Sequence, residues 1–316
     1  MLKFGFNAFG APDVFEAIQA DIPEPKPDQV QIKVMAFGLN PYDLQLLHGE
    51  PGVNAKFPIV PGTEVAGVIT KLGSDVTDLR VGDHVLNYRP RGGYSEYVTA
   101  TRKKVGRLDS DTPFTIGAAL PQIGIAAYSA VKLFNLKPGR TIAIEGASGG
   151  VGSIVLQIAK FQGLKIIATS HSRNHDLLMK LGADYTGHYD LENVGAAYAN
   201  QADYVFNGTT GGNDDGAGAW MLRDGGTYVS LNKLPESVKD NPNFHVVGEA
   251  GAPDVQQAFA FLQTLRMQAD LWVNIDKVFP MSVTGVQQAV AELATHHKAG
   301  KIICSREETK LVRPSL

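Results

Sequence analysis

The sequence predicts an α/β protein with two domains, one β-rich and one built on a doubly wound parallel sheet. Its 316 residues are many for one hydrophobic core, and the 44% that are hydrophobic are enough to fill two. Roughly the first hundred residues contain short apolar runs cut by glycine and proline. From about Phe114 onward the apolar runs become continuous, and helical patterns separate them. These observations place the β-rich region first and the parallel sheet after it.

The β-rich region is predicted from four strand-like segments, QVQIKVMAFGLN, EVAGVITKLG, GDHVLNY and GGYSEYVTA. Apolar and polar residues alternate in the first of them, and glycine or proline separates each from the next. Directly after the first strand, GLNPYDLQLLHG places Asn40, Tyr42 and Asp43 around a proline. These polar side chains either cap a turn or form part of a site.

The second region alternates predicted helices and strands. A helical stretch, PFTIGAALPQIGIAAYSAVKLF, precedes the strand TIAIEG, a tight turn, a helix and the strand KIIATS. Continuous apolar runs of this kind are typical of parallel strands covered on both faces. The pattern continues through ADYVFNG, GGTYVSLN and NFHVVGEAG, and then through the helical stretch PDVQQAFAFLQTLRMQADLW. The last part, DKVFPMSVTGVQQAVAELATHHKAGKIICS, predicts strand, helix and strand.

Composition excludes several classes of function. The net charge of −3 and the scattered charged residues give no basic surface for nucleic acid, which favours a small-molecule partner. The single cysteine, Cys304, excludes an internal disulfide and fits a reducing compartment. No apolar run approaches the roughly 20 residues that cross a bilayer, and MLKFGFNAFG lacks the apolar core of a signal peptide. We therefore expect a cytoplasmic protein with no membrane partner.

The turn GASGGVG, Gly146 to Gly152, predicts a dinucleotide site. Glycines let the backbone approach a pyrophosphate, and a helix N-terminus supplies N–H donors and the positive end of a dipole. The usual GxGxxG pattern is varied, because Ala147 takes its first position while Gly149 and Gly152 keep the others. The alternative is a tight turn without a ligand. The residues predicted to hold the cofactor here are Gly149, Gly150, Val151 and Gly152.

The end of the second strand of this region, IIATSHSRNHD, predicts NADPH rather than NADH. A carboxylate at this point would bind the ribose 2′-hydroxyl of NADH. Here the sequence has Ser170, Ser172 and Arg173, which can hydrogen-bond a 2′-phosphate without repelling it. The alternative is a solvated loop that the arginine caps. Further cofactor contacts are expected where two later strands end, at Asn207, Gly208, Thr209, Ser230 and Leu231.

Seven motifs are spread over most of the chain. They are GLNPYDLQLLHG, FPIVPGTEVAGVITKLGSDVTDLRVGDHV, GGYSEYV, AALPQIGIAAYSAV, GASGGVGSIVLQIAKFQG, LLMKLGADY and GKIICS. They resemble the zinc-independent quinone oxidoreductase branch, the zeta-crystallin-like proteins, of the medium-chain dehydrogenase/reductase superfamily. The resemblance implies a GroES-like β-rich catalytic domain from residues 1–117 and 266–316. It also implies a Rossmann nucleotide-binding domain at residues 118–265, with the nicotinamide in a cleft.

The resemblance also implies that no metal is bound. Zinc-dependent relatives carry a cysteine where this chain has Asn40 and a histidine where it has Thr63, and their third ligand aligns near Pro121 and Gln122. Catalytic zinc requires three donors from Cys, His, Asp or Glu. Without a Lewis acid, reduction of a quinone or conjugated enone is favoured over alcohol oxidation, because the charge that hydride transfer creates on such an acceptor is delocalised.

The roles of single residues follow from the same resemblance. Tyr42 matches a proton-relaying hydroxyl of the zinc-dependent relatives, so it is expected to protonate or hydrogen-bond the oxyanion. Asn40 is expected in the same cleft, whereas Asp43 is expected to bond local backbone N–H groups. Glu64 is expected to be structural. The other residues expected near the cofactor are Gln122, Val246, Val247, Gly248 and Lys301.

Three further expectations concern segments rather than single contacts. In relatives the edge strand around Val246 joins two subunits, which predicts a homodimer. Arg89 and Arg91 either border the cleft entrance or line a loop. His296 and His297 are expected to cap a helix rather than to bind a metal, because consecutive helical residues diverge in direction.

The sequence therefore predicts a zinc-independent, NADPH-dependent oxidoreductase that transfers hydride to quinones or related conjugated carbonyl compounds. Reduction of enones or enoyl thioesters is an alternative that the motifs do not separate from it. A third alternative is a nucleotide-sensing or RNA-binding role without catalysis, which the acidic net charge disfavours.

Overall fold

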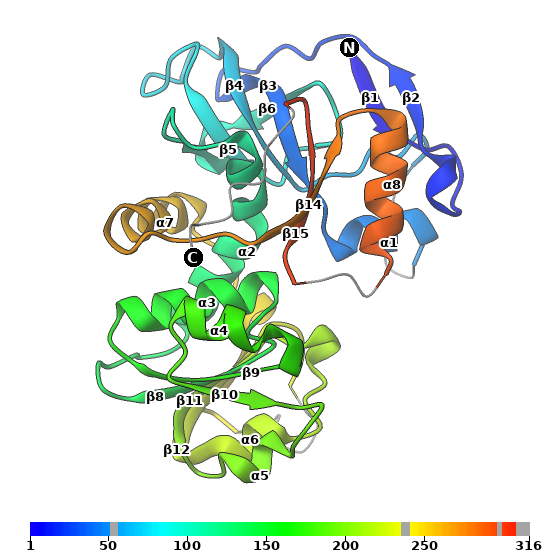
Figure 1. Ribbon diagram of the computed structural model, residues 1–316. Helices are drawn as coiled ribbons and strands as arrows, with labels where there is room; N and C mark the ends of the chain where they lie inside the picture. The colour runs from blue at the N-terminus through cyan, green and yellow to red at the C-terminus, as the bar shows by residue number, and fades with distance from the viewer. Residues whose placement is uncertain (51–55, 235–240, 296–298, 308–316) are drawn as a thin grey trace. The chain divides into compact units, whose positions relative to one another are not determined.

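The computed structural model describes residues 1–50, 56–234, 241–295 and 299–307 (Figure 1). The chain forms two compact units, which we call the β-rich unit, Met1–Gln122 with Asn274–Leu316, and the parallel-sheet unit, Ile123–Val273. The boundaries fall five and eight residues later than the expected 117/118 and 265/266. Two helices explain the difference. α2, Phe114–Lys132, runs unbroken across the first boundary, and α7, Val255–Ala269, runs through residue 265.

The β-rich unit is organised around a seven-stranded sheet of order β14-β15-β3-β4-β5-β7, with β6 paired to β3. The last strand of the chain, β15, lies antiparallel to β3 and pairs Ile303 with Gly38. The two ends of the sequence therefore share one sheet. The sheet strands are β3 Gln29–Gly38, β4 Glu64–Leu72, β5 His84–Tyr88, β6 Tyr97–Thr101, β7 Val105–Arg107, β14 Ile275–Pro280 and β15 Lys301–Ser305.

Aromatic side chains pack together among the aliphatic residues in the core of the β-rich unit. Phe37 on β3 stacks on Tyr94 with ring centroids 4.4 Å apart, and Phe6 meets Phe15 edge to face at 5.2 Å. The outer elements are a β1–β2 hairpin, a helix after β3 and a helix before β15. Their bounds are β1 Leu2–Gly5, β2 Glu16–Gln19, α1 Pro41–His48 and α8 Val283–Leu293, with 3-10 turns at Pro12–Val14 and Arg102–Lys104.

The parallel-sheet unit is a doubly wound sheet of six parallel strands in the order β10-β9-β8-β11-β12-β13. The chain builds outward from β8 to β10 and then returns to place β11 on the other side of β8. This reversal creates a switch point at the carboxyl ends of β8 and β11, where such sheets bind ligands. The strands are β8 Thr141–Glu145, β9 Lys165–Ser170, β10 Tyr185–His188, β11 Ala202–Asn207, β12 Leu222–Ser230 and β13 Phe244–Val246.

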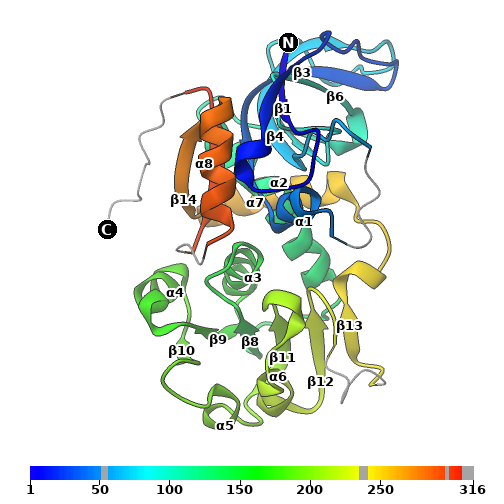
Figure 2. The ribbon, with the colours of Figure 1, turned by 90° about the vertical axis from the view of Figure 1, so that its right-hand side faces the viewer.

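Helices cover both faces of this sheet. α3, Gly150–Phe161, and α4, His175–Leu181, lie over one face, while α5, Val194–Ala197, and α6, Ala217–Met221, lie over the other (Figure 2). The chain after α7 stays attached to this unit, because Gln157 on α3 bonds both the N–H and the carbonyl of Trp272 at 2.8 and 2.9 Å. The fold is thus the expected pairing of a GroES-like β-rich domain with a Rossmann domain.

The sequence predicts no membrane-spanning segment, and helix α2 is the element to compare with that prediction. Among the described residues it is the one helix that by length and composition alone could cross a bilayer. Its most apolar window is 72% buried within the chain, and Pro121 lies inside it. Such burial is typical of the core helix of a soluble protein.

Candidate cofactor-binding and catalytic residues

The glycine-rich turn joins β8 to α3 at the switch point. Gly146 has a left-handed φ of +66°, which favours glycine, and a side chain there would meet the backbone of Gly208 at 3.0 Å. A side chain on Gly152 would collide with the carbonyl oxygen of Gly146, so this glycine lets α3 pack directly on the turn.

The first turn of α3 offers its N–H groups to an anion. The N-cap residue is Gly149, and no side chain caps the helix. The nearby Ser148 hydroxyl accepts a bond from Asn174 Nδ2 at 3.0 Å rather than turning to the helix. Uncapped N–H donors at the positive end of a helix dipole suit a pyrophosphate, so these residues fit a dinucleotide. Contacts of Gly149, Gly150, Val151 and Gly152 with a cofactor stay a prediction.

The expected 2′-phosphate donors follow β9, and two of them already have partners. The Ser170 hydroxyl donates to the carbonyl of His171 at 3.0 Å. Ser172 donates its N–H and its hydroxyl to the carboxylate of Asp190 at 2.7 and 2.6 Å. Hydrogen bonds from Ser172 lower the pKa of Asp190, which keeps this carboxylate charged. The guanidinium of the exposed Arg173 has no hydrogen bond or ion pair with a described residue.

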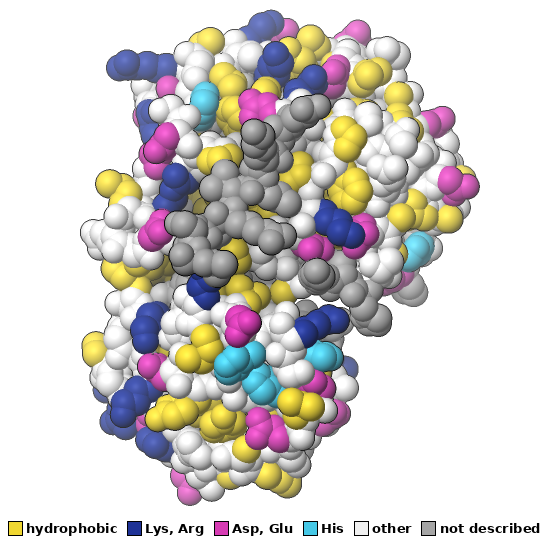
Figure 3. Space-filling model, in the orientation of Figure 1, with side chains coloured by type: hydrophobic (Ala, Val, Ile, Leu, Met, Phe, Trp, Pro, Cys, Tyr) yellow, Lys and Arg dark blue, Asp and Glu magenta, His cyan; other side chains and the backbone are white. Residues whose placement is uncertain are grey.

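Histidines gather beside this loop on the face shown in Figure 3, over α4 and the end of β10. His171 Nδ1 lies 3.5 Å from Asp190 Oδ2, and the rings of His175 and His188 are 5.3 Å apart. Sequence reasoning missed Asp190 and these histidines, because β10 meets β9 only through the pairing of the sheet.

The ends of β11 and β12 form a network of polar contacts within the unit. Asn207 is fully buried; its Nδ2 donates to Gly212 O and to the Tyr228 hydroxyl, and its Oδ1 accepts from Thr209. The Tyr228 hydroxyl donates onward to Asp214 at 2.7 Å. These bonds fix the loop after β11 and leave the Asn207 amide no free hydrogen.

The neighbouring cofactor candidates are also tied to this network. Leu231 N donates to Asn207 O at 2.9 Å, Ser230 is buried, and Gly208 N donates to Glu145 O at 3.0 Å. Burial, followed by the Asp214 carboxylate, raises the pKa of Glu145 well above its ordinary range. Sequence reasoning did not single it out.

The β-rich unit gathers Asn40, Thr63, Glu64 and Lys301 into a buried cluster that we call the ammonium cluster. The Lys301 ammonium lies 2.7 Å from each of three oxygens, Leu39 O, Asn40 Oδ1 and Glu64 Oε1. Strand β15 brings the lysine there by pairing with β3. The pair is desolvated, because the Lys301 and Glu64 side chains are 8% and 0% exposed.

Further bonds complete the ammonium cluster. Asn40 Nδ2 donates to Thr63 Oγ1 at 3.1 Å and to Glu64 Oε1 at 2.9 Å. Gln122 N donates to Glu64 Oε2 at 2.9 Å, whereas the buried Gln122 Oε1 has no partner among the described residues. Glu64 is thus bonded by three protein donors, and its expected structural role stays a prediction. A cofactor contact of Lys301 stays a prediction, since its ammonium is engaged by three protein oxygens.

Asp43 holds the start of α1 to the sheet. Its carboxylate accepts hydrogen bonds from Asn40 N at 2.8 Å, from Gly62 N at 3.2 Å and from the Tyr94 hydroxyl at 3.0 Å. Complete burial raises the pKa of Asp43 to about 6, against the lowering effect of these bonds. Its expected bonding of local N–H groups is confirmed.

Tyr42 differs from these neighbours because it lies in the first turn of α1 with 46% of its surface exposed. Its hydroxyl makes no hydrogen bond with a described residue. Among the hydrogen-bonding side chains of GLNPYD, it is the one open to solvent. Its role as a proton donor stays a prediction.

The donors of the ammonium cluster do not fit zinc. A backbone carbonyl, an amide oxygen and one carboxylate surround an ammonium ion, and an ammonium repels a divalent cation instead of binding it.

Other expected residues lie outside these groups. Val246 ends β13, at an edge of the parallel sheet, and Val247 and Gly248 follow it in a 3-10 turn. The exposed Arg89 and Arg91 line a loop beside the ammonium cluster's strand β4, with Arg89 N bonded to Thr63 O at 2.7 Å. His296 and His297 lie outside the described residues.

Known families match both units. The alcohol dehydrogenase GroES-like domain matches residues 26–110, and the zinc-binding dehydrogenase family matches residues 150–259. A probable quinone oxidoreductase of Schizosaccharomyces pombe is 31% identical over 239 residues, covering 74% of this chain and 72% of that protein. An NADPH-dependent alkenal/one oxidoreductase of Arabidopsis thaliana, named as chloroplastic, is 28% identical over 96% of this chain and 79% of its own length.

A solved structure agrees with these relatives. The quinone oxidoreductase from Coxiella burnetii superposes with a TM-score of 0.84 at 26% identity, over 97% of this chain and 99% of its own. A GroES-like unit joined to a doubly wound sheet with a glycine turn at its switch point defines a medium-chain dehydrogenase/reductase. Within that superfamily, the chain belongs to the zinc-independent quinone oxidoreductase branch.

Proposed function

We propose that this protein transfers hydride from NADPH to a quinone or a related conjugated carbonyl compound, without a metal. The observation that carries the proposal is the ammonium cluster. Where zinc-dependent relatives hold a Lewis acid, this chain holds an internally paired lysine and glutamate. Such an arrangement offers no strong electrophile to an isolated carbonyl, so the acceptor must delocalise the new charge itself.

The cofactor, when bound, supplies a hydride, and the chain supplies position and a proton. The acceptor gains the hydride as a new bond to hydrogen, and the resulting oxyanion takes a proton from the Tyr42 hydroxyl, which water then reprotonates. Asn40 acts in this proposal as a positioning residue, because both of its amide hydrogens are bonded within the ammonium cluster. Lys301 and Glu64 hold it in place.

Support for a nicotinamide dinucleotide comes from the fit of the glycine turn and the uncapped start of α3. Support for NADPH comes from the Arabidopsis relative, whose name states that dependence, and from Arg173. Because Asp190 engages Ser172, the preference for a 2′-phosphate rests on the Arg173 guanidinium more than on the serines. Arg173→Gln should lower the NADPH-to-NADH ratio of kcat/KM, and a wild-type ratio near one would contradict the preference.

One assay tests the whole proposal. Purified protein is treated with a chelator and mixed with NADPH or NADH and a panel of benzoquinones, naphthoquinones, enals and enoyl thioesters. We expect NADPH oxidation with quinones or conjugated carbonyls and no dependence on added zinc. Loss of activity on chelation with recovery on adding zinc would refute the metal-free mechanism.

The alkenal/one oxidoreductase relative favours one alternative, reduction of the carbon–carbon double bond of an enone. A product analysis separates it from quinone reduction, because the saturated carbonyl compound differs in mass from its substrate by two hydrogens. Tight NADPH binding with no oxidation by any acceptor in the panel would instead favour a nucleotide-sensing role.

The proposal includes a homodimer. β13 is the last strand in the order of the parallel sheet, so its outer edge has no partner within that sheet. An open edge of this kind pairs readily with another chain. Light scattering after gel filtration should give twice the monomer mass of 33.9 kDa, and a monomer at micromolar concentration would contradict it. A cytoplasmic location is proposed on sequence grounds, although one relative is named as chloroplastic.

A further inference from the structure

The β-rich unit contains a cavity of about 610 Å³ whose wall is strongly basic. None of its lining residues belongs to the ammonium cluster, to α1 or to the glycine turn. The wall includes one carboxylate, that of Glu24. Its cationic side chains are Lys3, Lys26, Arg89, Arg91, Lys103 and Lys104.

These cations come from segments far apart in the sequence. Lys3 lies on β1, Lys26 precedes β3, Arg91 follows β5, and Lys104 ends the 3-10 turn after β6. Folding therefore holds like charges around one space, which costs electrostatic energy unless an anion enters. A chain with a net charge of −3 has no general excess of basic residues that would explain such a grouping.

The acids near this wall are already paired with other cations. Glu24 bonds Lys71 at 2.6 Å, and Glu96, between two lining residues in sequence, bonds Arg306 at 2.8 Å. Neither Lys71 nor Arg306 lines the cavity. The cavity cations thus receive little charge compensation from these carboxylates.

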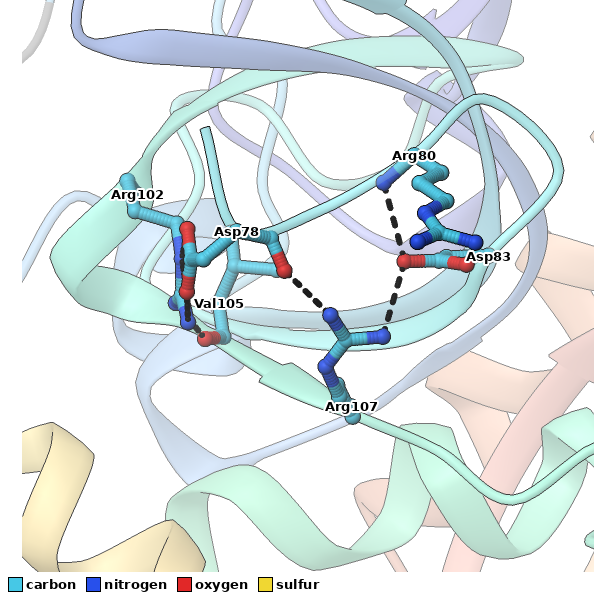
Figure 4. A network of polar contacts seen from close by, with 6 residues as sticks. All are labelled: Asp78, Arg80, Asp83, Arg102, Val105 and Arg107. Carbon is cyan, nitrogen blue, oxygen red and sulfur yellow. Dashed lines mark hydrogen bonds and ion pairs between the residues drawn. The ribbon is translucent and has the colours of Figure 1, made fainter. Parts of the chain in front are cut away.

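A second network pairs two more carboxylates of this unit with other cations. Asp78 accepts three hydrogen bonds from Arg102, and Asp83 pairs with Arg107 at 3.0 Å (Figure 4). By contrast, the charged side chains of Lys3, Lys26, Arg91 and Lys104 form no ion pair or hydrogen bond with any described residue, although the backbone of Lys26 and of Lys104 bonds to Gln29 and Asn87.

Polar groups in the wall add to this charge. Tyr97 and Thr99 bring hydroxyl groups to the lining. Asn87, Ser95 and Thr101 are further polar residues of the lining.

We propose that this cavity binds a small organic or inorganic anion with two or more phosphate groups. Its volume is typical of small-molecule sites, which span about 300–1,000 Å³. Several cations from separate segments favour a ligand with several charges, and lysine and arginine are the usual phosphate partners. The site is separate from the groups proposed for hydride transfer, so it provides a second, non-catalytic ligand site in the β-rich unit.

Tripolyphosphate is the probe, titrated by calorimetry into protein that holds one equivalent of NADPH, so that the glycine turn is occupied and no excess NADPH competes for the cavity. The cavity variant is Lys26→Gln with Lys104→Gln. The matched control is Lys165→Gln with Lys180→Gln, which removes the same charge from exposed positions of the parallel-sheet unit. Thermal unfolding shows whether both variants fold as the wild type does.

We expect one tripolyphosphate per chain, a Kd at least tenfold weaker in the cavity variant, and an unchanged Kd in the control. Raising the salt concentration should weaken binding, because charge dominates it. Hydrogen exchange should slow at β6, Tyr97–Thr101, when the probe is added. No binding, equal weakening in both variants, or citrate binding as tightly as tripolyphosphate would each overturn the proposal. Reductase activity is not the readout, so failure here leaves the proposed function untouched.

Discussion

Replacing Lys301 by methionine should destabilise the β-rich unit strongly. The substitution keeps most of the side-chain length but removes the ammonium that lies 2.7 Å from Glu64 Oε1. Glu64 has no exposed surface, so its carboxylate would stay buried with only the hydrogen bonds from Asn40 and Gln122. Removing one partner of a buried ion pair costs about 3–5 kcal/mol. For a unit of this size we expect Tm to fall by roughly 6–20 °C.

The chain carries separate probes for its two units. Cys304, the only cysteine, is buried on β15 in the β-rich unit, and burial raises the pKa of its thiol, so it is unreactive while the unit is folded. Both tryptophans, Trp220 and Trp272, lie in the parallel-sheet unit. Thiol labelling in increasing urea therefore reports unfolding of the first unit, and tryptophan fluorescence reports the second.

A double-mutant cycle separates the ion pair from general packing. Lys301→Met with Glu64→Gln removes both charges, so it should cost less than the sum of the two single changes, with a coupling of at least about 2 kcal/mol. The loss of stability in Lys301→Met should lower the urea midpoint measured by thiol labelling, and it should change the midpoint measured by tryptophan fluorescence much less. A cost below about 1 kcal/mol for Lys301→Met, or additive single changes, would refute the assignment of a stabilising buried pair.

Three further predictions concern other sites. The pKa of Asp43, about 6 in the folded protein and near 3.9 in the unfolded chain, means that its stabilising effect is complete below about pH 4 and is lost as pH rises through 6. Relative to Asp43→Asn, the wild type should therefore lose on the order of 3 kcal/mol of unfolding free energy between pH 4 and 7, and a flat difference would contradict this. Gly152→Ala should weaken NADPH binding at least tenfold in fluorescence titrations, because the added methyl group would collide with the carbonyl oxygen of Gly146, and an unchanged affinity would contradict this. Tyr42→Phe should lower kcat at least tenfold with NADPH affinity unchanged, and an unaltered kcat where hydride transfer limits turnover would remove its role.

Features set by local sequence were predicted well. The left-handed Gly146 and the close approach at Gly152 depend on residues within one turn, so a glycine pattern between a strand and a helix is enough to find them. The parallel sheet was predictable because continuous apolar runs identify its buried strands.

Features set by strand pairing were not predicted. Lys301 lies 261 positions from Asn40, and only the pairing of β15 with β3 brings them together. Asp190 reaches Ser172 through the β9–β10 pairing in the same way. The boundaries between the compact units differ from the expected ones for a related reason, because α2 crosses the first boundary and α7 runs through residue 265 without a break in periodicity.

The ammonium cluster also limits what kind of acceptor this protein can reduce. Lys301 donates to three protein oxygens, and Glu64 accepts from Lys301, Asn40 and Gln122, so the cluster has its partners inside the β-rich unit. It therefore fixes the turn after β3 and leaves Tyr42 as the exposed donor of GLNPYD. With little electrophilic help from the protein, the barrier to hydride transfer depends on how readily the acceptor itself takes the charge. Across a series of substituted quinones of similar size, kcat should rise with acceptor electrophilicity, and the rise should be steeper in Tyr42→Phe. A kcat independent of the acceptor, with hydride transfer shown to be rate-limiting, would mean that the protein supplies an electrophile the ammonium cluster does not provide.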